Sequence, residues 1–188
     1  ASQGITNVEF AEADLFDLPF EAAYFDHLFI CHLLEHQVEP VSGLTAIRKH
    51  LKPGGTVTVF EGDHGSCYFN PPSEDALMTW NCLIEVQRRL GANSLIGREL
   101  FPLITDAGFA RVRVEPKMVY IDQSRPELME SFVHKTIIPM VEGVREHAIE
   151  MDFIDEPTWH NGISDLHRIR HSEMGIFCYT FFKGRAIR

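Results

Sequence analysis

A glycine-rich stop between a predicted helix and a predicted strand constrains the fold of this 188-residue chain more than any other feature. Residues 38–51 carry apolar side chains at helical spacing, and Lys52-Pro53-Gly54-Gly55 ends that helix with a proline and glycines. The β-branched run 56–61 follows as a strand. The apolar run 25–32 precedes the helix, and we expect it to be a strand covered on both faces. Strand, helix, glycine-rich stop and strand form the pattern of a parallel α/β sheet.

The other predicted elements continue this pattern on both sides. Residues 7–14 alternate apolar and polar side chains, as a half-buried strand does. Pro116 places a later strand at a sheet edge or bulge, and Pro139 should kink or divide a long helix. The remaining predictions are a loop at 64–72, helices at 73–90, 97–107, 127–151 and 158–171, and strands at 110–121 and 176–182.

Composition excludes several classes of partner. The formal net charge of −10 repels phosphates, and no basic cluster with interleaved aromatics is present, so nucleic acid is not an expected partner. The four cysteines form no CxxC pair, which favours reduced thiols in a cytoplasmic protein. Cys67 and the nearby Asp63-His64 are spaced too loosely to predict a metal site. We expect neither a secretory signal nor a membrane span, because no apolar run approaches ~18 residues.

Four short segments carry a family resemblance in their order and spacing. They are Ala13-Asp14-Leu15-Phe16-Asp17-Leu18-Pro19-Phe20, Phe25-Asp26-His27 with Leu33-Leu34-Glu35-His36, Ile47-Arg48-Lys49-His50-Leu51-Lys52-Pro53-Gly54-Gly55, and the stretch from Leu103 to Phe109. Together they resemble the class I S-adenosylmethionine-dependent methyltransferases, in the branch of methyltransferase domain types 11 and 25 that includes the quinone-biosynthesis methyltransferases.

The resemblance implies a Rossmann-like α/β methyltransferase fold with a mostly parallel sheet and an antiparallel closing strand. The family's first two strands, its GxGxG-like loop and its acidic ribose-binding residue have no counterpart here. Gly62-Asp63-His64-Gly65 follows the fifth strand of the family and cannot substitute for that loop. We therefore interpret residues 1–188 as one N-terminally truncated methyltransferase domain that lacks the first two strands, with inserted lid helices in segments about 64–96 and 122–174. Strand 7–14 would then pair with the family's fourth strand, pair with another chain, or stay unpaired.

The resemblance also assigns contacts to the cofactor, S-adenosylmethionine. Asp14 would accept a hydrogen bond from the adenine amino group, with Leu15-Phe16 flanking the ring. Cys31, His32 and Leu33 end the family's fourth strand, where open α/β sheets bind ligands, and would face the methionine portion. The residue types alone leave structural roles open: Asp14 also suits a turn, and His32 a half-buried hydrogen-bonded imidazole.

Polar and aromatic residues after strand 56–61 are candidates for the acceptor site. Asp63 and His64 could form a catalytic base, and Glu61, Tyr68 and Trp80 could bind the substrate. A solvated loop is the alternative for the polar group, and core packing is the alternative for the aromatic residues.

Three functions remain open from the sequence. The first is methyl transfer to a small-molecule acceptor, in which the enzyme aligns nucleophile and methyl carbon at ~3 Å. The inserted helices would then form a lid, or equally a homodimer interface. The second is a non-catalytic truncated fragment that folds or dimerises without binding the cofactor. The third is another doubly wound enzyme, such as a nucleotide-dependent reductase, which the R-x-LKPGG-like segment speaks against.

Overall fold

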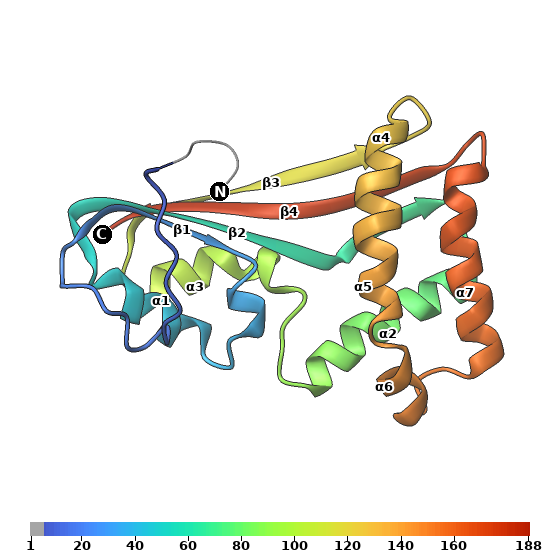
Figure 1. Cartoon of the computed structure of the whole chain (residues 1–188), viewed down its shortest axis with the longest axis horizontal. Coiled ribbons are helices and arrows are strands. Elements are labelled where there is room, and N and C mark those ends of the chain that lie inside the picture. The colour runs from blue at the N-terminus through green and yellow to red at the C-terminus, as the bar shows by residue number, and fades with distance from the viewer. Residues whose placement is uncertain (1–5) are drawn as a thin grey trace.

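A four-stranded sheet connects two groups of helices in the computed structural model, which describes residues 6–188 (Figure 1). Its order is β1-β2-β4-β3, made of β1 (Phe25–Cys31), β2 (Leu51–Asn70), β4 (Ile176–Ile187) and β3 (Ala110–Ile121). β1 and β2 are parallel, and β4 is antiparallel to both β2 and β3. Three strands therefore run in one direction and the closing strand in the other, which confirms the Rossmann-like α/β prediction. Strand 110–121, with Pro116, lies at the sheet edge as predicted.

The predicted loop at 64–72 is wrong for most of its length, because β2 continues to Asn70. The strand pairs with β4 on both sides of a register irregularity between Asp63 and Tyr68. A bulge of this kind absorbs residues that break the alternation and lets the ladder resume. β4 likewise extends to Ile187, beyond the predicted end at 182.

The predicted strand at 7–14 is also wrong, since these residues form no strand and are exposed. A strand needs a partner for its backbone N–H and C=O groups, and in the described part of the chain β1 pairs only with β2. Within this chain the segment is not paired with β1, and pairing with another chain stays a prediction. It is held instead by Leu15 and Leu18, which pack against a buried cluster under β1 and β2.

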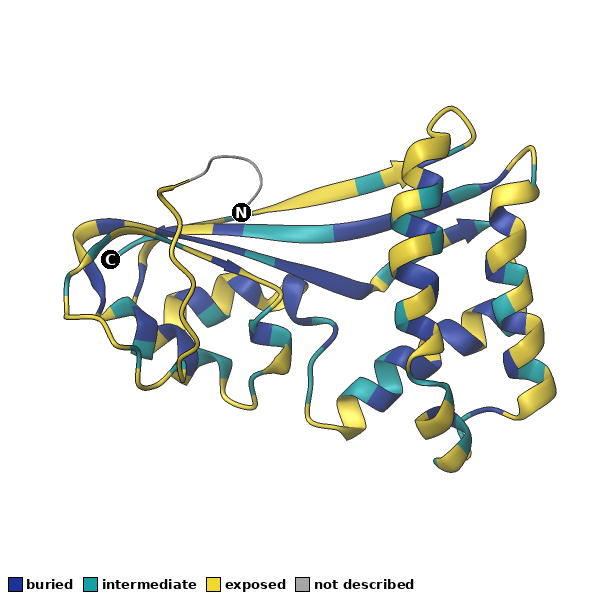
Figure 2. Cartoon of the chain, viewed as in Figure 1, coloured by how far each residue is buried: buried dark blue, intermediate teal, exposed yellow. Residues whose placement is uncertain are grey.

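The first group of helices lies on one face of the sheet, beside β1 and β2 (Figure 1). It contains η1 (Leu34–His36), α1 (Pro40–Arg48), η2 (Ile96–Glu99) and α3 (Leu100–Asp106). The predicted covering of β1 on both faces is wrong. Ile30 packs in the buried cluster with these helices, whereas Phe29, the residue before it, is 64% exposed. Figure 2 shows a similar contrast between strands: β2 has long buried stretches, whereas the edge strand β3 is mostly exposed.

The second group of helices packs where β2 and β3 end (Figure 1). It contains α2 (Glu74–Arg89), α4 (Pro126–Leu128), η3 (Met129–Ile137), α5 (Ile138–Glu142), α6 (Arg145–Glu150), α7 (Glu156–Arg168) and η4 (Ile169–His171). Ser73 caps α2 as a serine at this position should, by accepting a hydrogen bond from the Ala76 N–H. The group has its own core around Trp80, Trp159 and Phe177.

The predicted long helix 127–151 is divided near Pro139, as expected. The backbone changes from the π-helical η3 to the α-helical α5 at Ile138, and the chain turns at Gly143 and Val144 before α6. None of the described helices combines the length and apolar character required to cross a membrane. A lid role for this second group stays a prediction.

Candidate active site

The candidate site lies at the carboxyl end of β1, beside the middle of β2, and open α/β sheets bind ligands at such strand ends. His32 follows the last residue of β1 and has a left-handed backbone, with φ at 50°, a conformation in which histidine is enriched among non-glycine residues. Its N–H donates to the Phe60 carbonyl at 3.0 Å, so the turn is fixed to β2. This turn exposes the His32 imidazole at the end of the sheet.

Glu61 of β2 is the most buried acidic residue at this edge, with no exposed surface. Its Oε1 accepts hydrogen bonds from the N–H groups of Leu33 and Leu34, at 3.0 and 2.9 Å. Its Oε2 is buried and has no hydrogen-bond partner in the described structure. Burial raises the pKa of Glu61, while the two backbone N–H groups act in the opposite direction. Glu61 therefore joins β2 to the turn after β1 and keeps one carboxylate oxygen free.

Glu61 is one of three potential ligand side chains that converge here. One ligand atom each of His32, Glu35 and Glu61 lies within 4.8 Å of the others. Glu35 of η1 places its Oε1 3.9 Å from His32 Nδ1 and 3.6 Å from His36 Nε2. Burial, followed by the charges of Glu61 and Glu35, raises the pKa of the Cys31 thiol, which keeps it protonated at neutral pH. The arrangement can bind a cation or take up a proton.

Asp63 and His64, the predicted catalytic pair, make separate sets of contacts. Successive strand residues point to opposite faces of a sheet. The Asp63 carboxylate is buried and accepts two hydrogen bonds from Arg98 of η2, at 2.7 and 3.0 Å, and one from the Gly65 N–H. His64 Nδ1 lies 2.7 Å from the Tyr179 hydroxyl, and its Nε2 is buried without a partner. A catalytic role for the pair stays a prediction.

Burial also fixes the protonation of His64. It lowers the pKa of this imidazole to about 4, although the nearby Asp63 acts to raise it. His64 is therefore neutral at pH 7.

The two predicted substrate-binding aromatic residues occupy different environments. Trp80 is 2% exposed, and its indole N–H donates to the His64 carbonyl at 2.8 Å, as a core residue does. Tyr68 is 57% exposed on the distal part of β2. Substrate binding by either residue stays a prediction, as it does for Glu61.

The predicted adenine-binding segment forms an exposed turn. Asp14 Oδ1 accepts a hydrogen bond from the Phe16 N–H at 2.8 Å, and its carbonyl accepts one from the Asp17 N–H. Phe16 is 51% exposed, while Leu15 packs inward. Leu15 and Leu33 contact the same buried cluster, so the two predicted cofactor-binding segments share one support. Cofactor contacts at residues 14–16 and 31–33 stay predictions.

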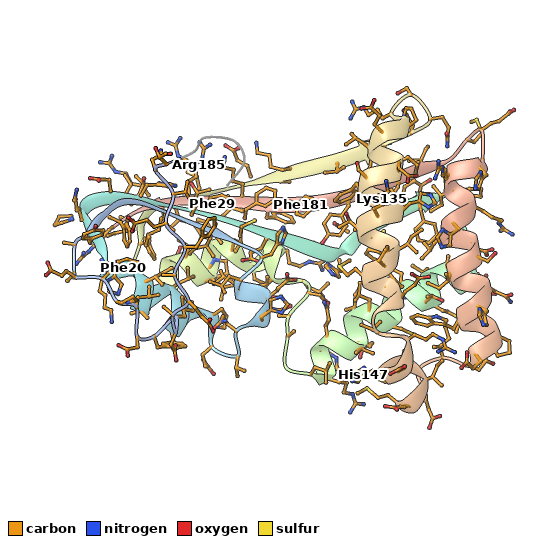
Figure 3. All side chains as sticks on the ribbon, in the orientation of Figure 1. Phe20, Phe29, Lys135, His147, Phe181 and Arg185 are labelled. Carbon is orange, nitrogen blue, oxygen red and sulfur yellow. The ribbon has the colours of Figure 1, made fainter. Side chains whose placement is uncertain are left out.

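A pocket lies elsewhere, on the face of the sheet opposite the first group of helices. It has a volume of about 550 Å³ and is lined by His27, Thr56, Arg111, Arg113 and Arg185, among others. Figure 3 shows Arg185, one of the lining residues, on β4. The pocket is near the amino ends of β1 and β2, so it is separate from the candidate site.

Sequence reasoning missed two residues that shape the site. Arg98 pairs with Asp63, and Tyr179 of β4 contacts His64. Arg98 lies in a predicted helix without any motif, and Tyr179 lies in an apolar strand, so neither carried a signal. The sequence shows Glu61 only as an acidic residue at the end of a predicted strand and does not reveal that one of its carboxylate oxygens lacks a hydrogen-bond partner.

Comparisons with known proteins give a consistent picture. The model of the methyltransferase domain family matches residues 1–59. An uncharacterized 37.1 kDa transposon protein of Streptomyces fradiae is 30% identical over 115 residues, 61% of this chain and 33% of its own length. The demethylmenaquinone methyltransferase of Clavibacter sepedonicus is 43% identical over 58 residues, 31% of this chain and 24% of its own length. This chain therefore aligns with about a quarter to a third of each of these curated relatives.

A solved structure supports the fold. The YcgJ protein of Bacillus subtilis superposes with a TM-score of 0.51 at 14% identity, covering 98% of this chain and 73% of its own. At this identity the likeness concerns the fold alone.

Proposed function

This chain belongs to the methyltransferase domain family through residues 1–59, and we propose that it takes part in methyl transfer from S-adenosylmethionine to a small-molecule acceptor. The family match is the observation that carries the proposal. It spans the Asp14 turn, all of β1 and the first half of β2, so it contains the residues at the candidate site edge up to Val59.

The residues present fit part of a cofactor site. Asp14 uses Oδ1 within its own turn, which leaves Oδ2 to accept from the adenine amino group, and the exposed ring of Phe16 can cover the adenine. Cys31, His32 and Leu33 would face the methionine portion at the end of β1. When bound, S-adenosylmethionine supplies an activated methyl group on a sulfonium, so the protein has only to align the acceptor and exclude water.

We place the acceptor over the carboxyl end of β1 and the middle of β2, beside Glu61. His64 is neutral but its low pKa makes it a weak base, because general bases work best with a pKa near the working pH. Asp63 is neutralised by Arg98. We therefore assign this pair to positioning, and expect an acceptor whose nucleophilic atom needs little help in losing a proton. Such a reaction fits a cytoplasmic enzyme with four free cysteines.

A second candidate function is a fragment that folds, or dimerises, without binding the cofactor by itself. The observation in its favour concerns the edge of β1 that faces away from β2. In the described residues that edge has no strand partner, and Phe29 is largely exposed on the uncovered face. On this candidate, a longer protein or a second copy would complete the cofactor site.

Calorimetric titration of the 188-residue chain with S-adenosylhomocysteine separates the two candidates. Micromolar binding that Asp14→Ala abolishes and Asp17→Ala preserves would support the first, because Asp17 belongs to the same exposed turn. Absence of heat from a folded sample would support the second.

A further inference from the structure

Three potential metal ligands meet at the carboxyl end of β1, beside the middle of β2. His32 comes from the end of β1, Glu35 from η1 and Glu61 from β2, and one ligand atom of each lies within 4.8 Å of the others. The three come from two stretches of sequence that only the β1–β2 pairing brings together. The cluster is therefore a product of the fold, and it differs from the loosely spaced Asp63, His64 and Cys67 considered from the sequence.

Glu61 supplies an independent sign that a ligand belongs here. Its side chain is fully buried, and Oε2 has no hydrogen-bond partner among the described residues. A buried, unpaired carboxylate oxygen costs free energy that a bound cation would recover. Oε1 is already occupied by the N–H groups of Leu33 and Leu34, so the carboxylate is fixed in orientation.

The donor set identifies the class of cation. One imidazole nitrogen with two carboxylates suits Mn²⁺, Fe²⁺, Co²⁺ or Zn²⁺, whereas Mg²⁺ and Ca²⁺ favour oxygen ligands alone. Around an ion with bonds of about 2.1 Å, adjacent ligand atoms lie about 3.0–3.5 Å apart. The 3.9 Å between His32 Nδ1 and Glu35 Oε1 closes to that range by a small side-chain rotation. The His32 side chain is 43% exposed and gives the ion access from solvent.

We propose that His32, Glu35 and Glu61 bind a divalent transition-metal ion at the carboxyl end of β1, beside the middle of β2. With three protein ligands, the ion keeps open coordination positions that face solvent on the His32 side. Metal binding at this site does not depend on the proposed methyl transfer. If the chain does transfer methyl groups, the open coordination positions would orient the acceptor, and that role alone rests on the proposed function. A protonated amine would also satisfy Glu61 Oε2, but it would need only carboxylates and gives no reason for an imidazole in the cluster.

The test is direct titration of the 188-residue chain with Mn²⁺, followed by electron paramagnetic resonance, and with Zn²⁺ in competition with a chromophoric chelator. We expect one site per chain. Changing an outer-shell partner of a metal ligand lowers metal affinity by at least about 10-fold, and loss of a direct ligand should lower it at least as much. His32→Asn and Glu61→Gln should therefore each raise the Kd for the metal about 10-fold or more. His32 is exposed enough that its replacement should leave the fold intact if Glu61→Gln does not.

Two variants control for surface binding. His167→Asn disrupts a pair of histidines away from the proposed site, in which the Nδ1 atoms of His134 and His167 lie 3.3 Å apart. Glu39→Gln removes an exposed carboxylate. Neither should change the Kd. The proposal is overturned if His32→Asn binds both metals like the wild type, or if neither metal binds while methylammonium raises the Tm. No cofactor is present in these titrations, so their failure is distinct from failure to bind S-adenosylhomocysteine.

Discussion

Glu61 Oε1 accepts the Leu34 N–H at 2.9 Å and thereby joins the middle of β2 to the turn that leaves β1. The same oxygen accepts the Leu33 N–H, so one buried carboxylate satisfies two backbone donors that no helix or strand provides for. The position of the candidate site depends on this connection.

Glu61→Ala should therefore destabilise the protein strongly. Each buried N–H left without an acceptor costs about 1–3 kcal/mol, so losing the acceptor of both should lower the free energy of unfolding by about 2–6 kcal/mol in urea titrations. Glu61→Gln keeps an oxygen at the Oε1 position and removes a charge that burial disfavours, and should lose much less. Equal losses in the two variants would show that the hydrogen bonds to Leu33 and Leu34 contribute little.

The Asp63–Arg98 pair should contribute more than an ordinary surface ion pair. The Asp63 side chain is 4% exposed, and Arg98→Ala would leave its charge buried and unpaired. Breaking a buried pair costs about 3–5 kcal/mol, and the half-exposed Arg98 places this one at the lower end, near 3 kcal/mol. Arg88→Ala, which breaks an exposed pair with Glu85, is the control and should cost about 0–1 kcal/mol. Adding Asp63→Asn to Arg98→Ala should recover part of the loss; a further loss would contradict the argument.

Local signals in the sequence located the elements between β1 and the first half of β2. α1 ends at Arg48, a few residues before the predicted stop, and Lys52-Pro53-Gly54-Gly55 lies inside β2, where the φ of +78° at Gly54 favours glycine. Such requirements act within a few residues, so they are readable from the chain.

Elements that depend on distant partners could not be predicted in the same way. Residues 7–14 have the alternation of a strand but no neighbouring strand to pair with. Residues 64–70 resemble a loop, yet they join the sheet because β4, more than 100 residues later, pairs with them, as at Tyr68 and Cys178. The same holds for the candidate site: the sequence predicts Glu61 as a substrate-binding residue, but its hydrogen bonds to the turn after β1 and its proximity to Glu35 follow from the β1–β2 pairing.

The depressed pKa of His64 predicts a loss of stability in acid. A histidine whose pKa is about 4 in the folded protein and near 6.5 when unfolded stabilises the fold fully above pH 6.5. That contribution is lost as the pH falls from 6.5 towards 4, and its full size is on the order of 3 kcal/mol. We expect the free energy of unfolding, measured in urea from about pH 7.5 down to about pH 4.5, to fall less steeply in His64→Gln than in the wild type. His36→Gln replaces an exposed imidazole and should keep the wild-type slope.

The packing of α2 against α7 should depend on a single glycine. A Cβ at Gly162 of α7 would lie 2.0 Å from Thr79 Oγ1 and 2.5 Å from the Asp75 carbonyl oxygen of α2, and a backbone carbonyl cannot move aside cheaply. Gly162→Ala should therefore force the helices apart and lower the free energy of unfolding by about 1–3 kcal/mol, measured by urea denaturation. Gly143→Ala is the matched control, because its Cβ would meet only ordinary contacts at 3.4 and 3.5 Å and its backbone is already helical. That variant should be neutral or more stable by up to about 1 kcal/mol. If Gly162→Ala is as stable as Gly143→Ala, the two helices are not packed as closely as described.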